Sequence, residues 1–329
     1  MKITRRKFIK FAGIAGLVGL TGGLTACGNN SASTGSVAEA DKLPPDDKAK
    51  VYFSKNIDAE HLISLYDKIN SEITGKVAIK LHTGEPNGPN ILPRDMVQAF
   101  QSQIPNSAIV ETNTLYGGAR STTERHRRTL KTNGWTFCEV DILDEDGDTN
   151  FPVKKGFHLD EVAVGSHLTN YDSLVVLTHF KGHAMGGFGG SLKNIAIGCA
   201  SGKVGKKQIH GEDWTMGEIF MERMADSGKA ICDHFGRKIV YINVLSRLSV
   251  DCDCAGTGAT APELPDLGIV ASTDILAVDQ AAVDMIYNFP GDEKKSLIER
   301  IESRGGLRQL SAMEEHQMGT PNYEIITVE

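Results

Sequence analysis

The chain has 329 residues, 40% of them hydrophobic, and a net charge of −7. This acidic balance argues against nucleic-acid binding, because domains that bind nucleic acid present clustered positive charge. Roughly 280 residues follow the polar N-terminal stretch, enough for one large or two moderate lobes with a real core.

The N-terminus is typical of an export signal. Residues 4–10 read TRRKFIK, a twin-arginine address, and a glycine-rich apolar stretch follows. That stretch is roughly 16 residues long, short of the ~20 that a membrane-spanning helix needs, and the chain has no second long apolar run. Residues 1–26 carry five basic groups and no acid, so the remainder has a charge of −7 − 5 = −12. We expect residues 1–26 to be a signal peptide that the twin-arginine export machinery reads.

Cys27 follows the small-residue sequence LTA, which resembles the lipobox of bacterial lipoproteins. We expect a lipid on Cys27 to anchor the protein to a membrane. The anchor would lie on the outside of the bacterial cytoplasmic membrane or on the periplasmic side of an outer membrane. The alternative is simple cleavage near Ala26. Residues 27–48 are rich in Ser, Asn, Gly, Asp and Pro and predict a flexible linker, and residues 49–329 predict the folded domain.

Apolar runs and helical patterns alternate along the domain. We predict strands over 76–84, 107–114, 136–143, 173–180, 238–250 and 323–329, and helices over 93–104, 122–134, 214–236 and 275–289. This alternation predicts an α/β fold, with flanking helices and a largely parallel sheet. An arrangement in two lobes around a central cleft, divided between 200 and 215, is an alternative.

In such sheets, ligands bind beyond the carboxyl ends of the strands. Three strand ends are followed by chemically rich segments: residues 82–90, 178–198 and 251–260. We therefore look for the site in these three segments.

Residues 178–198 read THFKGHAMGGFGGSLKNIAIG. His179 and His183 follow a strand, and Lys193 and Asn194 lie near the predicted start of a helix, where free N–H groups favour anions. The glycines between them, including Gly187, Gly189 and Gly190, would let the backbone approach a planar or charged cofactor. The cluster predicts a cofactor site, and a glycine-rich turn with structural histidines is the alternative.

Cys252 and Cys254 are two residues apart, so in an extended segment they share one face and could bind a soft metal. Cys199 is the best candidate for a third thiolate, and His179 or His183 would have to complete the set. The alternatives are a buried apolar pair and a local disulfide. Beyond Cys27 the number of cysteines is odd, so at least one thiol is free, buried or bound.

Residues 178–198, together with the stretch from VDCDCAG to DILAVDQAAVD, resemble the bacterial family called domain of unknown function 362. Members are often labelled uncharacterised iron–sulfur-centre proteins. The resemblance implies a protein with an iron–sulfur cluster or another metal and a redox function on a small molecule. Some members carry an inserted ferredoxin module with C-x-x-C cysteines, which this chain lacks.

A second, more distant resemblance is to the lactate racemase family and covers one loop. It rests on His183, Gly187, Phe188, Gly190, Lys193 and Gly198. This resemblance implies a nickel-pincer nucleotide joined to Lys193, with His183 shuttling a proton. His210 would coordinate nickel and His82 would be the second catalytic histidine. A cofactor-free exported binding protein is the third alternative, and in each case the partner is a small-molecule substrate or a redox partner.

Overall fold

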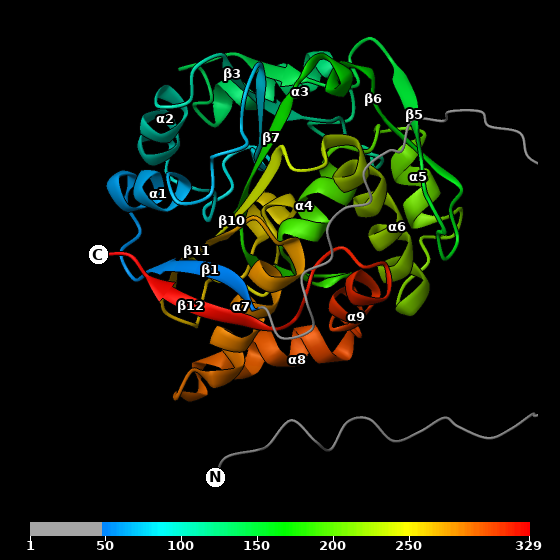
Figure 1. Ribbon diagram of the computed structural model, residues 1–329. Helices are drawn as coiled ribbons and strands as arrows, with labels where there is room; N and C mark the ends of the chain where they lie inside the picture. The colour runs from blue at the N-terminus through cyan, green and yellow to red at the C-terminus, as the bar shows by residue number, and fades with distance from the viewer. Residues whose placement is uncertain (1–47) are drawn as a thin grey trace, which may run out of the picture. The chain divides into compact units, whose positions relative to one another are not determined.

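The sheet that organises the fold has eight strands. In this computed structural model, which describes residues 48–329, they follow the order β12-β1-β11-β10-β7-β2-β3-β4 (Figure 1). Their bounds are β1 Ala49–Ser54, β2 Val77–Lys80, β3 Ser107–Glu111, β4 Val140–Ile142, β7 Ser173–His179, β10 Ile239–Leu245, β11 Gly268–Ser272 and β12 Tyr323–Thr327. Only β11 runs antiparallel to its neighbours, so the predicted largely parallel sheet is confirmed.

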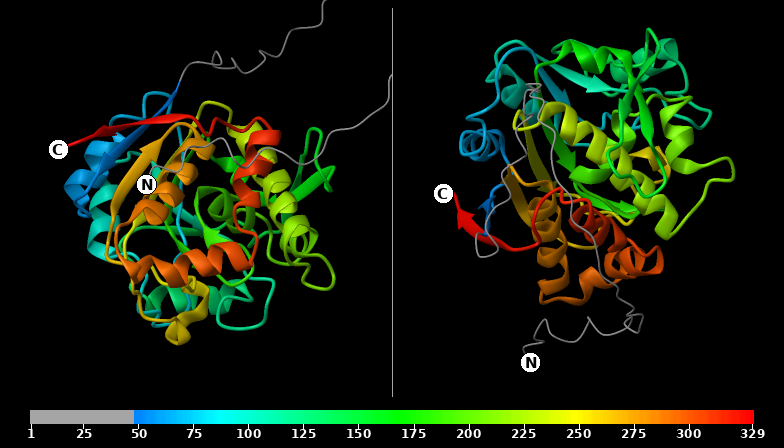
Figure 2. Two further views of the ribbon diagram at one scale, coloured as in Figure 1. Left: turned by 90° about the horizontal axis from the view of Figure 1, so that it is seen from below. Right: turned by 45° about the vertical axis from the view of Figure 1, so that its right-hand side comes forward.

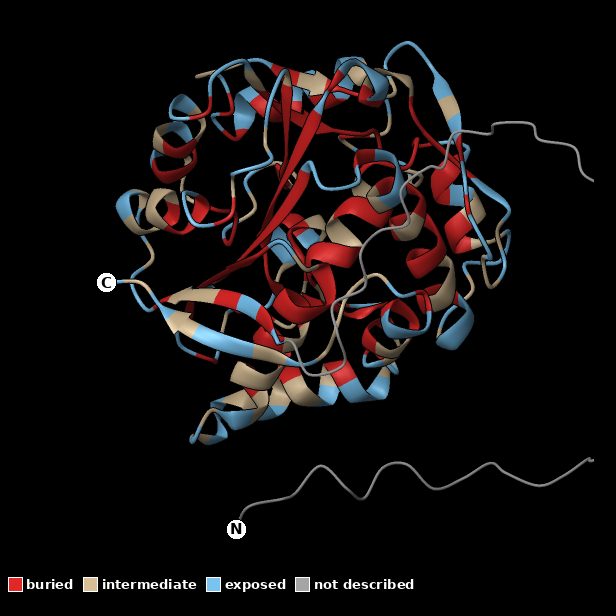
Figure 3. Ribbon diagram, viewed as in Figure 1, coloured by how far each residue is buried: buried red, intermediate tan, exposed pale blue. Residues whose placement is uncertain are grey.

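The central strands are buried because both faces of the sheet are covered. All seven residues of β7 and all seven of β10 are buried (Figure 3). Successive side chains of a strand point to opposite faces, so Leu174 and Val176 enter one hydrophobic core while Val175 and Leu177 enter the other. This explains why β7 reads as a continuous apolar run in the sequence.

Helices form a layer on each face of the sheet (Figures 1 and 2). One core contains side chains from α1 Ala59–Tyr66, α2 Arg94–Ser102 and α3 Thr123–Thr132. The other contains side chains from α4 Ser191–Gly198, α5 Gly205–His210, α6 Glu218–Phe235, α7 Ile275–Asn288, α8 Lys295–Ser303 and α9 Arg308–Glu315. Two short hairpins, β5 Asp148–Pro152 with β6 Glu161–Gly165 and β8 Lys181–His183 with β9 Gly187–Gly189, complete the fold.

The predicted strands and helices all occur, and each is shorter than predicted. The described residues form one compact unit. The sheet does not divide between 200 and 215, because β7 before this segment and β10 after it are paired in parallel.

The predictions for the signal peptide, the Cys27 lipid anchor and most of the linker concern residues 1–47. These residues lie outside the described part of the chain. Within the described part, no helix is both long and apolar enough to span a bilayer.

Candidate functional site

A cavity of about 380 Å³ lies beyond the carboxyl ends of the parallel strands β2, β3, β7 and β10. All three segments singled out in the sequence contribute to its wall. His82 comes from the loop after β2, His183 and Lys193 follow β7, and Cys252 and Cys254 follow β10. Parallel strands bring their carboxyl ends to the same edge of the sheet, which is why these distant segments meet.

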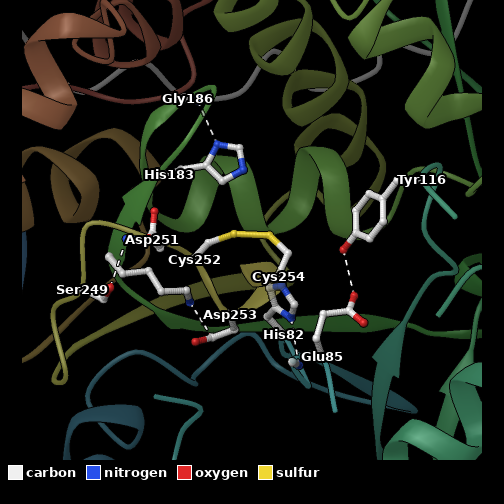
Figure 4. Close-up of a disulfide and its surroundings, with 12 residues drawn as sticks. His82, Glu85, Tyr116, His183, Gly186, Ser249, Asp251, Cys252, Asp253 and Cys254 are labelled. Atoms are coloured by element: carbon white, nitrogen blue, oxygen red, sulfur yellow. Dashed lines mark hydrogen bonds and ion pairs between the residues drawn. A yellow bond between two sulfur atoms is a disulfide. The ribbon is translucent and has the colours of Figure 1, made fainter. Parts of the chain in front are cut away.

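His183 ends β8 and is held by the turn that follows. Its Nδ1 accepts a hydrogen bond from the Gly186 N–H at 2.8 Å (Figure 4). Because a backbone N–H can only donate, Nδ1 carries no proton and the proton of the neutral ring is on Nε2. His82 has the same arrangement, since its Nδ1 accepts from the Gly84 N–H at 3.0 Å.

Burial lowers the pKa of His183 well below its ordinary value, and the positive charge of Lys193 lowers it further. Burial and Arg120 likewise lower the pKa of His82. Both rings are therefore neutral at pH 7 and have a single hydrogen to donate, at Nε2. A proton shuttle at His183 would need a lone pair on Nε2, so this geometry favours a hydrogen-bond donor instead.

Lys193 lies in the first turn of α4 and lines the cavity. Within the described part of the chain it has no hydrogen bond and no ion pair. Burial lowers its pKa to about 7, with further contributions from Lys181, Lys80 and Arg120. Near neutral pH about half of the Lys193 side chains are therefore neutral amines, which can accept a proton or act as a nucleophile.

The first two N–H groups of α4 are not free to bind an anion, contrary to our expectation. The Asp279 carboxylate of α7 accepts from the Ser191 N–H at 2.7 Å and from the Leu192 N–H at 3.0 Å. Asn194 is also committed, because its amide donates to the Thr178 hydroxyl at 3.0 Å and to the Leu177 carbonyl at 3.1 Å. These bonds fix the helix turn that carries Lys193.

The glycines before α4 approach other parts of the chain. A Cβ on Gly190 would lie 2.6 Å from Asp279 Oδ1, and one on Gly187 would lie 2.9 Å from the Ile301 carbonyl oxygen. A Cβ on Gly189 would lie 3.3 Å from Lys193 Cδ. None of these three glycines lines the cavity. Their small size is thus explained by packing against α7, α8 and Lys193.

Buried charged side chains line part of the cavity, and we did not predict them from the sequence. Lys80 Nζ lies 3.1 Å from Glu111 Oε2, Arg120 Nη1 lies 3.5 Å from Glu111 Oε1, and Lys206 donates to the Thr112 hydroxyl at 2.6 Å. Burial alone would raise the pKa of Glu111, but the positive charges of Lys80 and Arg120 hold it well below its ordinary value. The sequence did contain a signal for them, because the apolar runs VAIK and SAIVE each end in a charged residue, Lys80 and Glu111.

Cys252 and Cys254 are joined by a disulfide (Figure 4). A nitrogen of His183 and both sulfur atoms lie within 4.8 Å of one another, so in reduced form the three residues could ligate a metal ion. An iron–sulfur cluster of either common type takes four protein ligands. The described residues bring only two thiols and one imidazole together here, so they do not fit such a cluster.

The remaining predicted ligands are separate from this group. Cys199 is fully buried in the hydrophobic core, where burial raises its pKa to about 12. His210 lines the cavity, stacks on Phe220 with ring centroids 5.0 Å apart, and has an Nδ1 without a hydrogen-bond partner among the described residues.

His179 does not line the cavity. Both of its nitrogens are used by the protein: Nδ1 lies 3.0 Å from Asp253 Oδ2, and Nε2 lies 2.7 Å from the Ser246 carbonyl oxygen. It therefore supports the loop that carries the cysteines.

Solved structures that are similar to this chain include the following two. The lactate racemase apoprotein from Thermoanaerobacterium thermosaccharolyticum is 11% identical with a TM-score of 0.40, and the match covers 88% of this chain and 85% of that one. A protein from Thermotoga maritima is 10% identical with a TM-score of 0.44, covering 76% of this chain and 60% of that one. At these values neither similarity transfers an activity.

No curated protein matches the chain in sequence. A family model does match, over residues 77–284. The match covers well over half of the 329 residues and includes the predicted site segments, which confirms the resemblance stated from the sequence. The chain belongs to the family described as Domain of unknown function (DUF362).

Proposed function

We propose that the protein is an enzyme that transfers a proton on a small anionic molecule bound in the cavity. Lys193 is the base, and His183 and His82 donate hydrogen bonds to the negative charge that develops on the substrate. The observation that carries this proposal is the position of Lys193: an amine on the cavity wall, surrounded by cations and without a partner among the described residues.

The charge balance of the cavity supports an anionic substrate. Lys80, Arg120 and Lys206 line the cavity together with Lys193, and Glu111 is shared by Lys80 and Arg120. Asp251, the other carboxylate on the wall, is paired with Arg300 outside it at 3.1 Å. An excess of positive charge in a cleft with low-dielectric walls attracts anions.

The hydrogen-bond donors suit the chemistry. Removing a proton from a carbon next to a carbonyl or carboxyl group places negative charge on an oxygen. Neutral Nε2–H groups that the protein has already oriented can stabilise that charge without reorganisation. A lysine whose pKa is lowered towards neutrality matches the requirement for a general base at pH 7.

The proposal can be tested by hydrogen exchange with solvent. The protein is incubated in D₂O with a panel of small 2-oxo and 2-hydroxy carboxylates, and deuterium at carbon is followed by NMR. We expect exchange for at least one member, and a loss of at least a hundredfold in Lys193→Met, in the range usual for a removed general base. Lys203→Met, an exposed lysine outside the cavity lining, is the matched control. Equal exchange in the two variants, or none with any member, would refute the assignment.

A lysine-tethered cofactor is a second candidate. It rests on two groups that line the same cavity without partners among the described residues, the Lys193 amine and His210 Nδ1. In a nickel-pincer arrangement Lys193 would hold the group and His210 would coordinate the metal, and the group would supply redox chemistry. Nickel analysis and intact mass of protein from the native host decide this candidate, since an unmodified Lys193 contradicts it.

We further propose export through the twin-arginine route and a lipid anchor on Cys27, on the sequence patterns alone. Labelling of cells with a fatty-acid analogue should mark the protein, and Cys27→Ser should abolish the label. A label that persists in this variant would contradict the anchor.

A further inference from the structure

We infer that Cys252 and Cys254 form a redox-active pair, whose disulfide exchanges with dithiol molecules or dithiol proteins that reach the cavity. This inference does not depend on the proposed proton transfer. Both cysteines line the cavity, next to His183.

The disulfide contributes little to holding the fold together. It closes a loop with one residue between the cysteines, and the stabilisation from a cross-link is smallest for the shortest loops. Other bonds hold this loop in place: the Asp253 carbonyl accepts from the Glu85 N–H at 3.1 Å, and its carboxylate lies 2.7 Å from Lys181 Nζ. The loop would therefore keep its position when the disulfide is reduced.

The two cysteines differ in exposure, and from this difference we infer the direction of exchange. Cys252 is 7% exposed, whereas Cys254 is partly exposed and precedes the exposed Ala255. An incoming thiolate attacks Cys254 Sγ, forms a mixed disulfide there and releases Cys252 as a thiolate. The second thiol of the dithiol then attacks the mixed disulfide, leaves as the oxidised dithiol and releases Cys254. Two electrons and two protons pass from the dithiol to the pair.

The surroundings favour the thiolate that leaves. The two carboxylates that flank Cys252 in sequence are paired with cations: Asp251 with Arg300 at 3.1 Å and Asp253 with Lys181 at 2.7 Å. Neither carboxylate therefore acts on the thiolate as an unbalanced negative charge. The neutral His183 ring beside the pair has an Nε2–H to donate. A hydrogen bond to the charged form of a buried group favours that form, so this donor would stabilise the thiolate.

The same ring argues against a resident metal. A histidine that ligates a metal nearly always donates its other ring N–H to an acceptor. Here the other nitrogen, Nδ1, accepts from the Gly186 N–H. His183 is thus oriented to donate from Nε2 rather than to coordinate a metal through it.

Graded reduction of the folded full-length chain tests the inference. The protein is equilibrated with mixtures of reduced and oxidised dithiothreitol, quenched in acid, and alkylated after unfolding. Peptide masses then report each cysteine. We expect Cys252 and Cys254 to gain the label together while circular dichroism stays unchanged. Cys138, Cys199 and Cys232, which are free thiols, should be labelled throughout. A pair that stays oxidised until the protein unfolds overturns the inference.

Variants test the direction of exchange and the role of His183. In Cys252→Ser, oxidised glutathione should form a stable mixed disulfide on Cys254, and in Cys254→Ser the reaction at Cys252 should be at least tenfold slower. His183→Leu should slow reduction at least tenfold. His183→Gln, which keeps an N–H donor, and His61→Leu on α1 should slow it less than threefold. Equal rates in the two cysteine variants or in His183→Leu and wild type would overturn the inference. Stoichiometric Zn²⁺ binding by the reduced protein, lost in Cys254→Ser, would do so too.

Discussion

The titration of Lys193 is the most direct check on the site. Its pKa of about 7 has a structural cause: burial disfavours the charged form, and Lys181, Lys80 and Arg120 add positive charge around it. Asp253 is the anion that opposes this effect, and it is already paired with Lys181. His183 and His210 face the same cavity and are neutral at pH 7 because burial lowers the pKa of each, to about 4 for His210.

This pKa predicts unusual reactivity towards acylating reagents. At pH 7 about half of the Lys193 amines are neutral, against roughly 0.04% for an ordinary lysine with a pKa of about 10.4. A less basic amine is also a weaker nucleophile. With a Brønsted slope of about 0.4–0.5, as for thiolates, the roughly thousandfold excess of free amine becomes an advantage of about 30-fold in rate.

The assay is competitive acetylation with trace isotopic acetic anhydride between pH 5 and 10, read by peptide mass spectrometry. Lys154, an exposed lysine outside the cavity, is the internal reference. We expect the labelling of Lys193 to reach half of its maximum near pH 7 and to exceed that of Lys154 there. A midpoint above pH 9 would show that Lys193 is solvated or paired, and the reasoning on the site would be wrong.

Three further predictions concern stability, measured by urea unfolding. Gly198→Ala would place Cβ 2.1 Å from Lys80 Cε and force the Lys80 ammonium away from Glu111. We therefore expect the free energy of unfolding to fall by about 3–5 kcal/mol. The control Gly117→Ala, whose added Cβ has no neighbour within 4 Å, should cost less than about 1 kcal/mol, and similar losses would contradict the explanation. Asp279→Ala leaves two helix N–H groups without an acceptor and should lower the free energy of unfolding by about 2–4 kcal/mol. Asp279→Asn should lower it less, and an equal loss in the two variants would argue against the hydrogen bonds. Lys193→Met should stabilise the protein more at pH 6 than at pH 10. The pKa of Lys193 is lower in the folded protein than in the unfolded chain, so the unfolded chain binds more protons between about pH 7 and 10.4. The cost of burying the charged lysine is therefore complete below this pH window and decreases as the pH rises through it. Equal effects of the substitution at both pH values would contradict the lowered pKa.

The fold could be predicted from local patterns to a considerable extent. Apolar runs such as SLVVLTH identified the central strands, and each predicted strand and helix occurs. The edge region was harder to predict. Strand β11 is antiparallel to both β1 and β10, and its pairing with β1 depends on contacts between segments more than 200 residues apart. No local period carries that information.

The candidate site likewise contains residues that the sequence identified and residues whose role only the structure showed. His82, His183, Lys193 and the C-x-C pair were found because each follows a strand. Gly187 and Gly190 were read as ligand contacts, whereas the structure packs them against α8 and α7. A glycine indicates that something comes close, and the sequence does not tell whether that is a ligand or another part of the chain.

The sequence by itself determined the class of the fold, the three loops that form the site and the family. These follow from local periodicity and motif spacing, which tertiary contacts do not alter. Only the tertiary structure decided the chemical state of the groups. Lys193 is desolvated and has cations around it. The Gly186 N–H donates to His183 Nδ1, so the ring proton is on Nε2 and the ring is a hydrogen-bond donor. Cys252 and Cys254 are joined by a disulfide. Protonation and pairing depend on burial and on neighbours at distances of a few ångströms, and the order of residues along the chain does not give those distances.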